Sequence, residues 1–272
     1  MTATGPRETH TVEPPPDEDD WPAGIDRDLL IEAVRRSNVL AELRSGPADA
    51  SELEAALDVS RSTIHRATKS LEELNLIEKS NGRFELTGVG DVVARETDVY
   101  GRRIAAAISL EPFLNLVDVE DVPIEHFADA TVTVPKPRQP HFTVRRIMDL
   151  IEEADSLRLF TSVISPFYVD VAHREILEGT EVEAIFDADI LDIVLAEYES
   201  EARGAIETGN FDVYVHDSVP FELFLLDGKI GMAAHDENGI ARVFVEADSP
   251  EAIRWARRLY DRYLAESRHK AP

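Results

Sequence analysis

The sequence predicts an α+β protein of two domains, a small helical N-terminal domain and a larger C-terminal α/β domain. Apolar residues recur at helical spacing from residue 26 to 74 and are followed by a β-hairpin signal. From residue 144 onward, short apolar runs alternate with amphipathic stretches, as strands and helices do in α/β proteins. Charge divides the chain in the same way, since residues 25–104 carry a net −3 and residues 105–272 carry −18.

The first segment of the chain is predicted to be a disordered acidic leader. It contains a proline run ending at Pro16, an acidic run beginning at Asp17, a net charge of −5 and few apolar residues that could offset the cost of ordering. The expected boundaries are 1–24 for this leader, 25–88 for the N-terminal domain, 89–140 for a linker helix and interdomain segment, and 141–268 for the C-terminal domain.

The N-terminal domain is expected to begin with two helices. The first runs from Asp26 through Leu43, and Gly46 followed by proline ends it. Asp49 or Ser51 caps the second helix, with Glu54 in the capping-box position.

A third helix and a hairpin complete the domain. Ser60 is the expected N-cap, and the inner face carries Ile64, Ala67, Leu71 and Leu74. Two alternating stretches follow, at 76–79 and 83–87. Asn81-Gly82 lies between them, which is a strong signal for a hairpin turn.

Three helices followed by a hairpin is the element order of a winged helix-turn-helix. Residues 51–77, from Ser-Glu-Leu to Leu-Asn-Leu-Ile, resemble the ArsR and TrmB-type archaeal regulators, and the hairpin falls where the wing belongs. The resemblance implies that the third helix is a recognition helix and that double-stranded DNA, at a promoter or operator, is the partner.

The outward residues of the third helix suit DNA recognition. From Ser60 to Leu71 there are three cations and no acid, in a chain whose net charge is −26. The candidate DNA-binding residues are Ser60, Arg61, Ser62, Thr63, His65, Arg66, Lys69, and Lys79 and Arg83 of the wing. The alternative is a solvated helix face on a protein-interaction adaptor that does not bind DNA.

Two features between the domains leave several interpretations open. The apolar spacing from Gly88 to Leu110 predicts a long helix that serves dimerisation or domain docking, or else belongs to the first core. A homodimer would match palindromic half-sites.

The acid-free stretch 133–148 contains Arg145 and Arg146. It could form interdomain ion pairs, contact phosphate or bind an anionic effector.

The C-terminal domain is expected to run β-α-β-α-β, then three antiparallel strands and a final helix. Its strands are predicted near 157–164, 182–186, 211–215, 221–226, 229–234 and 241–245, with helices at 144–154, 168–177 and 190–207 and one starting at Ser249-Pro250. The motifs Ser165-Pro166-Phe167-Tyr168, Leu226-Asp227-Gly228-Lys229 and 248–252 resemble the middle domain of regulators typed by a methanogenesis regulatory protein. The resemblance implies a layout similar to the phospholipase D-like domain of TrmB regulators.

No catalytic or metal motif accompanies that layout. A phospholipase D site requires His-x-Lys-x4-Asp, and no histidine here is followed at plus two by lysine. The sequence therefore predicts a sensing or assembly domain rather than an enzyme, with no cofactor and no metal site. A small-molecule effector could bind beyond the carboxyl ends of the parallel strands, where the candidate effector residues are Ser162, Ser165, Asp187 and Arg145.

The composition excludes several kinds of chemical site and indicates where the protein is located. The absence of cysteine excludes disulfides, thiolate zinc sites and cysteine nucleophiles. No membrane span or secretory leader is recognisable, so a cytoplasmic protein is expected. The excess of acid resembles that of proteins from salt-in halophilic archaea, whose medium screens diffuse repulsion. Acidity of this origin does not argue against a DNA partner.

Overall fold

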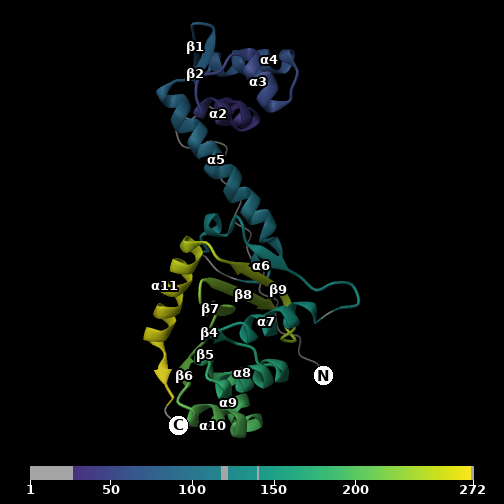
Figure 1. Cartoon of the computed structure of the whole chain (residues 1–272), viewed down its shortest axis with the longest axis vertical. Coiled ribbons are helices and arrows are strands. Elements are labelled where there is room, and N and C mark those ends of the chain that lie inside the picture. The colour runs from purple at the N-terminus through teal and green to yellow at the C-terminus, as the bar shows by residue number, and fades with distance from the viewer. Residues whose placement is uncertain (1–26, 118–121, 140, 271–272) are drawn as a thin grey trace, which may run out of the picture. The chain divides into compact units, whose positions relative to one another are not determined.

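The computed structural model describes residues 27–117, 122–139 and 141–270 (Figure 1). The predicted acidic leader, residues 1–24, lies outside the described residues. The chain divides between Asp98 and Val99 into two compact units. The expected two-part α+β architecture, with a helical N-terminal part and a C-terminal α/β part, is confirmed.

The N-terminal unit is a helical cluster closed by a two-stranded hairpin. Its elements are α1 (Arg27–Arg35), α2 (Ser37–Arg44), α3 (Ala50–Leu57), α4 (Arg61–Glu73), β1 (Ile77–Ser80), β2 (Arg83–Leu86) and the first part of α5 (Gly88–Ser109). The prediction of one helix from Asp26 to Leu43 was wrong. The helix breaks at Arg36, whose φ and ψ are −107° and 16°, directly before Ser37 and Asn38, which are poor helix formers.

The helices α3 and α4 each begin at a side-chain cap. Asp49 caps α3, and its Oδ1 accepts hydrogen bonds from the backbone of Ser51 and Glu52 at 2.8 and 3.0 Å. Asp49 N donates in return to Glu52 Oε2 at 2.7 Å, so Glu52 and not Glu54 completes the capping box. The cap of α4 is Ser60, as predicted.

The core of the N-terminal unit forms where the inner faces of the helices meet the hairpin. Leu40, Leu53 and Leu71 are fully buried there. The hairpin turns at Asn81 and Gly82, both with positive φ, which confirms the predicted Asn-Gly turn. Phe84 of β2 pairs with Ala48 in an isolated bridge, which joins the hairpin to the segment before α3.

The C-terminal unit is a mixed sheet covered by helices on both faces. Its elements are α6 (Glu111–Leu114), a 3-10 turn η1 (Ile124–Phe127), β3 (Thr131–Thr133), α7 (Phe142–Glu152), β4 (Ser156–Thr161), α8 (Pro166–Glu178), β5 (Glu181–Asp187), α9 (Ala188–Glu197), α10 (Glu199–Glu207), β6 (Phe211–His216), β7 (Glu222–Leu226), β8 (Lys229–His235), β9 (Ala241–Ala247), α11 (Pro250–Glu266) and β10 (Arg268–His269). The strand order is β10-β6-β5-β4-β7-β8-β9-β3.

This topology follows the predicted order closely. β4, β5 and β6 are parallel, whereas β7, β8 and β9 continue the sheet as an antiparallel meander. The single helix predicted at 190–207 is two helices, because Tyr198 leaves the helical conformation with φ and ψ of −128° and 27°. The short edge strands β3 and β10 were not predicted.

The two faces of the sheet carry different helices, and each face has its own core. On one face lies α11, the yellow helix of Figure 1. Its residues Trp255, Leu259 and Tyr260 are buried in the core of this face. On the other face, α7 and α8 pack over β4 and β7 through residues such as Leu150 and Ile176. Strand β7 is buried along its whole length, since both faces are covered.

Two glycines of α5 provide a test of packing in this fold. A Cβ at Gly90 would lie 1.7 Å from the backbone oxygen of Leu76, whereas a Cβ at Gly101 would have no neighbour within 4 Å. Gly90→Ala should therefore lower the melting temperature. Gly101→Ala, the matched control, should stabilise the helix by up to about 1 kcal/mol. Thermal unfolding of the full chain measures both, and a neutral Gly90→Ala would contradict the close approach.

Candidate nucleic-acid interface and ligand cavity

The exposed side of α4 carries the residues expected to contact DNA. Its inward residues Ile64, Ala67 and Leu71 are buried in the N-terminal core. The polar residues of the opposite side are Arg61, Ser62, His65, Arg66 and Lys69, all exposed, and Thr63, which is half-buried. One surface of the helix therefore presents three cations and a histidine, and residues 60–71 contain no carboxylate.

Short-range contacts order the start of this surface. Ser60 Oγ accepts a hydrogen bond from Thr63 N at 3.3 Å and lies 2.9 Å from Ser62 Oγ. Arg66 Nε donates to the backbone oxygen of Ser62 at 3.3 Å. Lys69 lies 3.8 Å from Glu73, one turn later. These exposed contacts all lie within α4 and its N-cap residue.

The position of α4 is fixed on its far side by a polar contact with α1. Ser70 Oγ donates a hydrogen bond of 2.9 Å to Glu32 Oε2, and Glu32 also pairs with Arg35 and Arg36. The bond from Ser70, followed by the charges of the two arginines, holds the pKa of Glu32 below its usual value. Glu32 therefore links α1 to the helix that carries the basic surface.

The two basic residues of the hairpin have different surroundings. Lys79 is exposed, and its Nζ lies 4.9 Å from the centroid of the Phe84 ring. Arg83 instead donates to the carbonyl oxygen of Pro47 and pairs with Glu52 at 2.7 Å. Of the two, Lys79 is the freer to reach a phosphate, whereas Arg83 fastens the hairpin to the start of α3.

Arg146, in the basic stretch of residues 133–148, is committed to ion pairs within the C-terminal unit. Its Nε and one terminal nitrogen donate to the two carboxylate oxygens of Glu246 at 2.8 and 2.6 Å. This bidentate bond raises the pKa of the Arg146 guanidinium, and Glu153 lies 3.7 Å away. Arg146 therefore forms ion pairs, but they are not the interdomain pairs that were expected, because Glu153, directly after α7, and Glu246, on β9, belong to the same unit as Arg146.

The four candidate effector residues have different surroundings, and none of them lines the cavity described below. Asp187 caps α9 by accepting from Ile190 N at 2.8 Å, and Ser165 is the N-cap residue of α8 without a side-chain cap bond. Ser162 is half-buried after β4, and Arg145 is exposed on α7. Thr161 and Phe186, which neighbour Ser162 and Asp187 in sequence, line the cavity described next, but the four candidates themselves do not.

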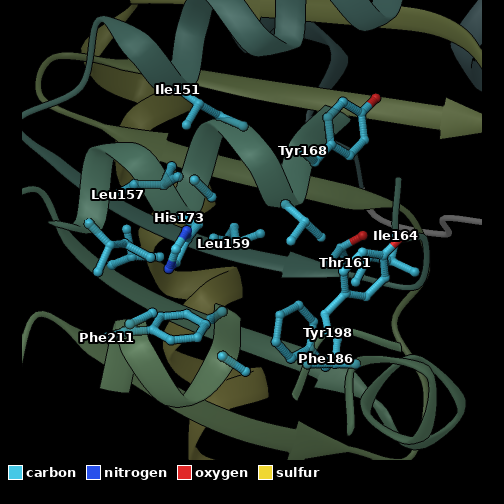
Figure 2. Close-up of a pocket in the computed structure, with 18 of the residues that line it drawn as sticks. Ile151, Leu157, Leu159, Thr161, Ile164, Tyr168, His173, Phe186, Tyr198 and Phe211 are labelled. Atoms are coloured by element: carbon cyan, nitrogen blue, oxygen red, sulfur yellow. The ribbon is translucent and has the colours of Figure 1, made fainter. Parts of the chain in front are cut away.

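An apolar cavity of about 110 Å³ lies between the sheet and the helices α8 to α10 (Figure 2). Figure 2 shows lining side chains from α7, β4, α8 and the α9–α10 junction around this space. The lining is mostly aliphatic and aromatic and contains no lysine or arginine. Its polar members are Thr161, Tyr168, His173, Tyr198, Glu201 and Glu222.

One of these polar residues is a buried carboxylate. Glu222, at the start of β7, is 1% exposed. Its Oε1 accepts a hydrogen bond of 2.6 Å from Thr161 Oγ1 at the end of β4. Its Oε2 lies 3.1 Å from His235 Nε2, but neither of these two atoms has a hydrogen-bond partner. Desolvation, and secondly the charge of Glu222, raise the pKa of Tyr168.

Sequence reasoning missed Glu222, because the apolar residues that follow it indicate a buried strand and give no sign of a polar site. Among the described residues, no group of three His, Asp or Glu side chains is arranged to hold a metal ion. None of the described helices has the length and apolarity needed to cross a membrane.

The class of protein follows from family matches to the two units. Residues 140–266 match the family described as "Methanogenesis regulatory protein FilR1, middle domain", and residues 25–108 match "HVO_A0261 N-terminal domain". The predicted methanogenesis-regulatory-protein-type middle domain is confirmed, and the matches indicate a transcription regulator.

Other similarities are partial or distant. A curated imidazole-4-carboxamide isomerase of Parafrankia sp. (strain EAN1pec) is 36% identical over 83 residues, which cover 30% of this chain and 32% of the isomerase. The match thus spans about a third of the relative's length. Three solved structures show a distant likeness of shape. TrmBL2, an archaeal chromatin protein, has a TM-score of 0.43 and 14% identity, and the match covers 90% of this chain and 100% of that chain. NucT from Helicobacter pylori has a TM-score of 0.41 and 13% identity, with 52% of this chain and 98% of that chain covered. The phospholipase D family member Nuc from Salmonella typhimurium has a TM-score of 0.39 and 12% identity, with 53% of this chain and 99% of that chain covered.

The Ser70–Glu32 bond leads to a test of how α4 is anchored. Ser70→Ala should destabilise the N-terminal unit by about 1 kcal/mol at pH 7. Because the pKa of Glu32 is lower in the folded than in the unfolded protein, its ionised carboxylate stabilises the fold at pH values above the unfolded-state pKa. This stabilisation is lost as the pH falls through the folded-state pKa. The deficit should therefore shrink in acid. Denaturant unfolding between pH 3 and 7 at constant KCl measures it, with exposed Ser51→Ala as control. A deficit that does not change with pH would contradict the role of Glu32.

Proposed function

We propose that this protein is a cytoplasmic, sequence-specific DNA-binding transcription regulator of the archaeal type, with a C-terminal sensing domain that has no catalytic role. The observation that carries the proposal is the exposed side of α4 on a winged-helix scaffold, which has three cations and no acid from Arg61 to Leu71. In this proposal Arg61 and Arg66 reach base edges, because an arginine can donate two hydrogen bonds to guanine. Ser60, Ser62, Thr63, His65 and Lys69 add donors for bases and phosphates, and Lys79 extends the contact through the wing.

The net charge of −26 is compatible with this proposal. Phosphate binding depends on the cations within a few ångströms of the backbone, since salt screens more distant charges. At about 1 M salt the Debye length is only about 3 Å, so acids elsewhere on the molecule add little repulsion. The charge of the docking surface, rather than the total, then decides whether DNA binds.

A homodimer is the proposed binding form. On the part of α5 after Val99, Tyr100, Ile104 and Ile108 recur every four residues and are exposed by 56, 43 and 68%. An exposed apolar stripe of this kind on a long helix suits pairing with the same helix of a second copy. Two copies would then present two α4 helices to the half-sites of a palindrome.

The alternative is an adaptor that uses the winged helix to bind a protein. In that case the exposed residues of α4 would recognise a partner surface, and DNA would not be retained at any salt concentration. The absence of acid from Ser60 to Leu71 favours DNA, because an adaptor surface has no need to exclude carboxylates.

The DNA proposal predicts which arginines matter. Arg61→Ala and Arg66→Ala should each weaken binding to fragments selected from a random library by about 5- to 150-fold, the cost of losing a base contact. Arg203→Ala, an exposed arginine on α10, is the matched control and should bind like the wild type. Fluorescence anisotropy across a KCl series gives the affinities and slopes. Unchanged binding by the Arg61/Arg66 double variant would refute the assignment.

The dimer proposal predicts the effect of charge on α5. Placing aspartates at Ile104 and Ile108 should convert a dimer into a monomer, because two carboxylates on each copy would face one another. Size-exclusion chromatography with light scattering in KCl measures the mass. Exposed Leu177→Asp on α8 is the control and should leave the mass unchanged. A wild-type monomer at every concentration tested would contradict the dimer.

A further inference from the structure

Glu222 is a buried carboxylate whose two oxygens have different contacts. Burying a carboxylate oxygen is unfavourable unless a donor satisfies it. Thr161 donates to Oε1, whereas Oε2 lies 3.1 Å from His235 Nε2 without the geometry of a hydrogen bond. Glu222 borders the apolar cavity, so a donor group placed in that cavity would have a carboxylate within reach.

We propose that the cavity binds a small apolar molecule that carries one hydrogen-bond-donating group, an amine or a hydroxyl, with the donor directed at Glu222. The aliphatic and aromatic lining would bury the body of the ligand, and the carboxylate would orient its polar end. This is the usual composition of a small-molecule site, a mostly apolar wall with a few polar groups.

Size and charge restrict the ligand further. An engineered cavity of about 150 Å³ in another protein holds one benzene, so a cavity of about 110 Å³ that is open at one end limits the enclosed part of the ligand to about one small ring or a short branched chain. The lining contains Glu222 and Glu201 but no lysine or arginine. An anionic ligand would meet two carboxylates and no counter-charge, and is therefore excluded from the proposed class.

The ligand would have a route to the cavity. His173, Tyr198 and Glu201 belong to the lining and are only half-buried, so the end of the cavity between α8 and α10 is reached from solvent. Gly204, on α10, lies in the same region, where a Cβ would come within 3.4 Å of His173 Nε2. The buried end of the cavity, with Thr161 and Glu222, lies at the sheet.

A purely structural role for Glu222 makes a different prediction. The carboxylate could serve only to join β4, β7 and the end of β8 through Thr161 and His235. Its replacement would then change the stability of the fold but not the relative affinities of the cavity for different ligands. Ligand selectivity, rather than stability, therefore separates the two roles. As an effector site the cavity deepens the proposed regulatory function and rests on it, but ligand binding can be measured without DNA.

The test uses four compounds that share one ring: toluene, benzyl alcohol, benzylamine and benzoate. Isothermal titration of the full chain in KCl, without DNA, gives their affinities. Benzyl alcohol and benzylamine should bind at least about tenfold more tightly than toluene, a difference of about 1.4 kcal/mol, and benzoate should not bind. No binding by any of the four, equal binding of toluene and benzylamine, or preferential binding of benzoate would each overturn the proposal.

Variants assign the effect to the carboxylate. Glu222→Gln should weaken benzylamine about tenfold and benzyl alcohol less, because the amide keeps an acceptor but loses the charge. Exposed Glu181→Gln on β5 should change neither affinity. Ala172→Leu should abolish binding of every compound that the wild type binds, because the larger side chain fills the cavity. If Glu222→Gln binds benzylamine as the wild type does, the proposal fails. If Glu222→Gln does not fold, the wild-type series and Ala172→Leu still decide it. DNA binding in the absence of compound tests the regulatory function separately.

Discussion

Packing of Ile64, Ala67 and Leu71 into the N-terminal core determines which side of α4 faces solvent. A helix that buries one apolar stripe has no freedom to rotate, so the direction of Arg61, His65 and Arg66 is set by residues that never meet a ligand. The cap at Ser60 and the bond from Ser70 to Glu32 fix the two ends of the same helix. The exposed basic surface of α4 is thus a consequence of core packing.

The same constraint explains how an acidic chain can keep a basic surface. The net charge of residues 105–272 is −18, whereas residues 25–104 are close to neutral. Carboxylates in the N-terminal unit serve caps and ion pairs, such as Asp49 at α3 and Glu52 beside Arg83. Because α4 has a hydroxyl cap and no acid up to Leu71, its surface escapes the general excess of negative charge.

Much of the fold was predictable from the sequence, because its strongest signals are local. The Asn81-Gly82 turn, the Ser60 cap and the alternation of strands and helices each depend on a few adjacent residues. The breaks at Arg36 and Tyr198 were not predictable, since a one-residue distortion leaves the apolar periodicity on both sides intact. The strands β3 and β10 have too few residues to show a pattern.

The cavity lay beyond sequence reasoning for a different reason. Its volume is set by distances between α8, α10 and the sheet, and Glu222 sits in an apolar stretch that otherwise indicates a buried strand. The cavity does include Thr161 and Phe186, the sequence neighbours of the candidates Ser162 and Asp187 at the carboxyl ends of β4 and β5. The exposed residues of α4, by contrast, follow directly from helical spacing.

The central claim, that the outer side of α4 reads DNA, is tested most directly by mapping where the protein is bound across the genome of its own cells. The account predicts occupancy concentrated at discrete promoter sites that share a pseudo-palindromic sequence with half-sites about one helical turn apart. Occupancy spread evenly over the genome, or none above background, would contradict it.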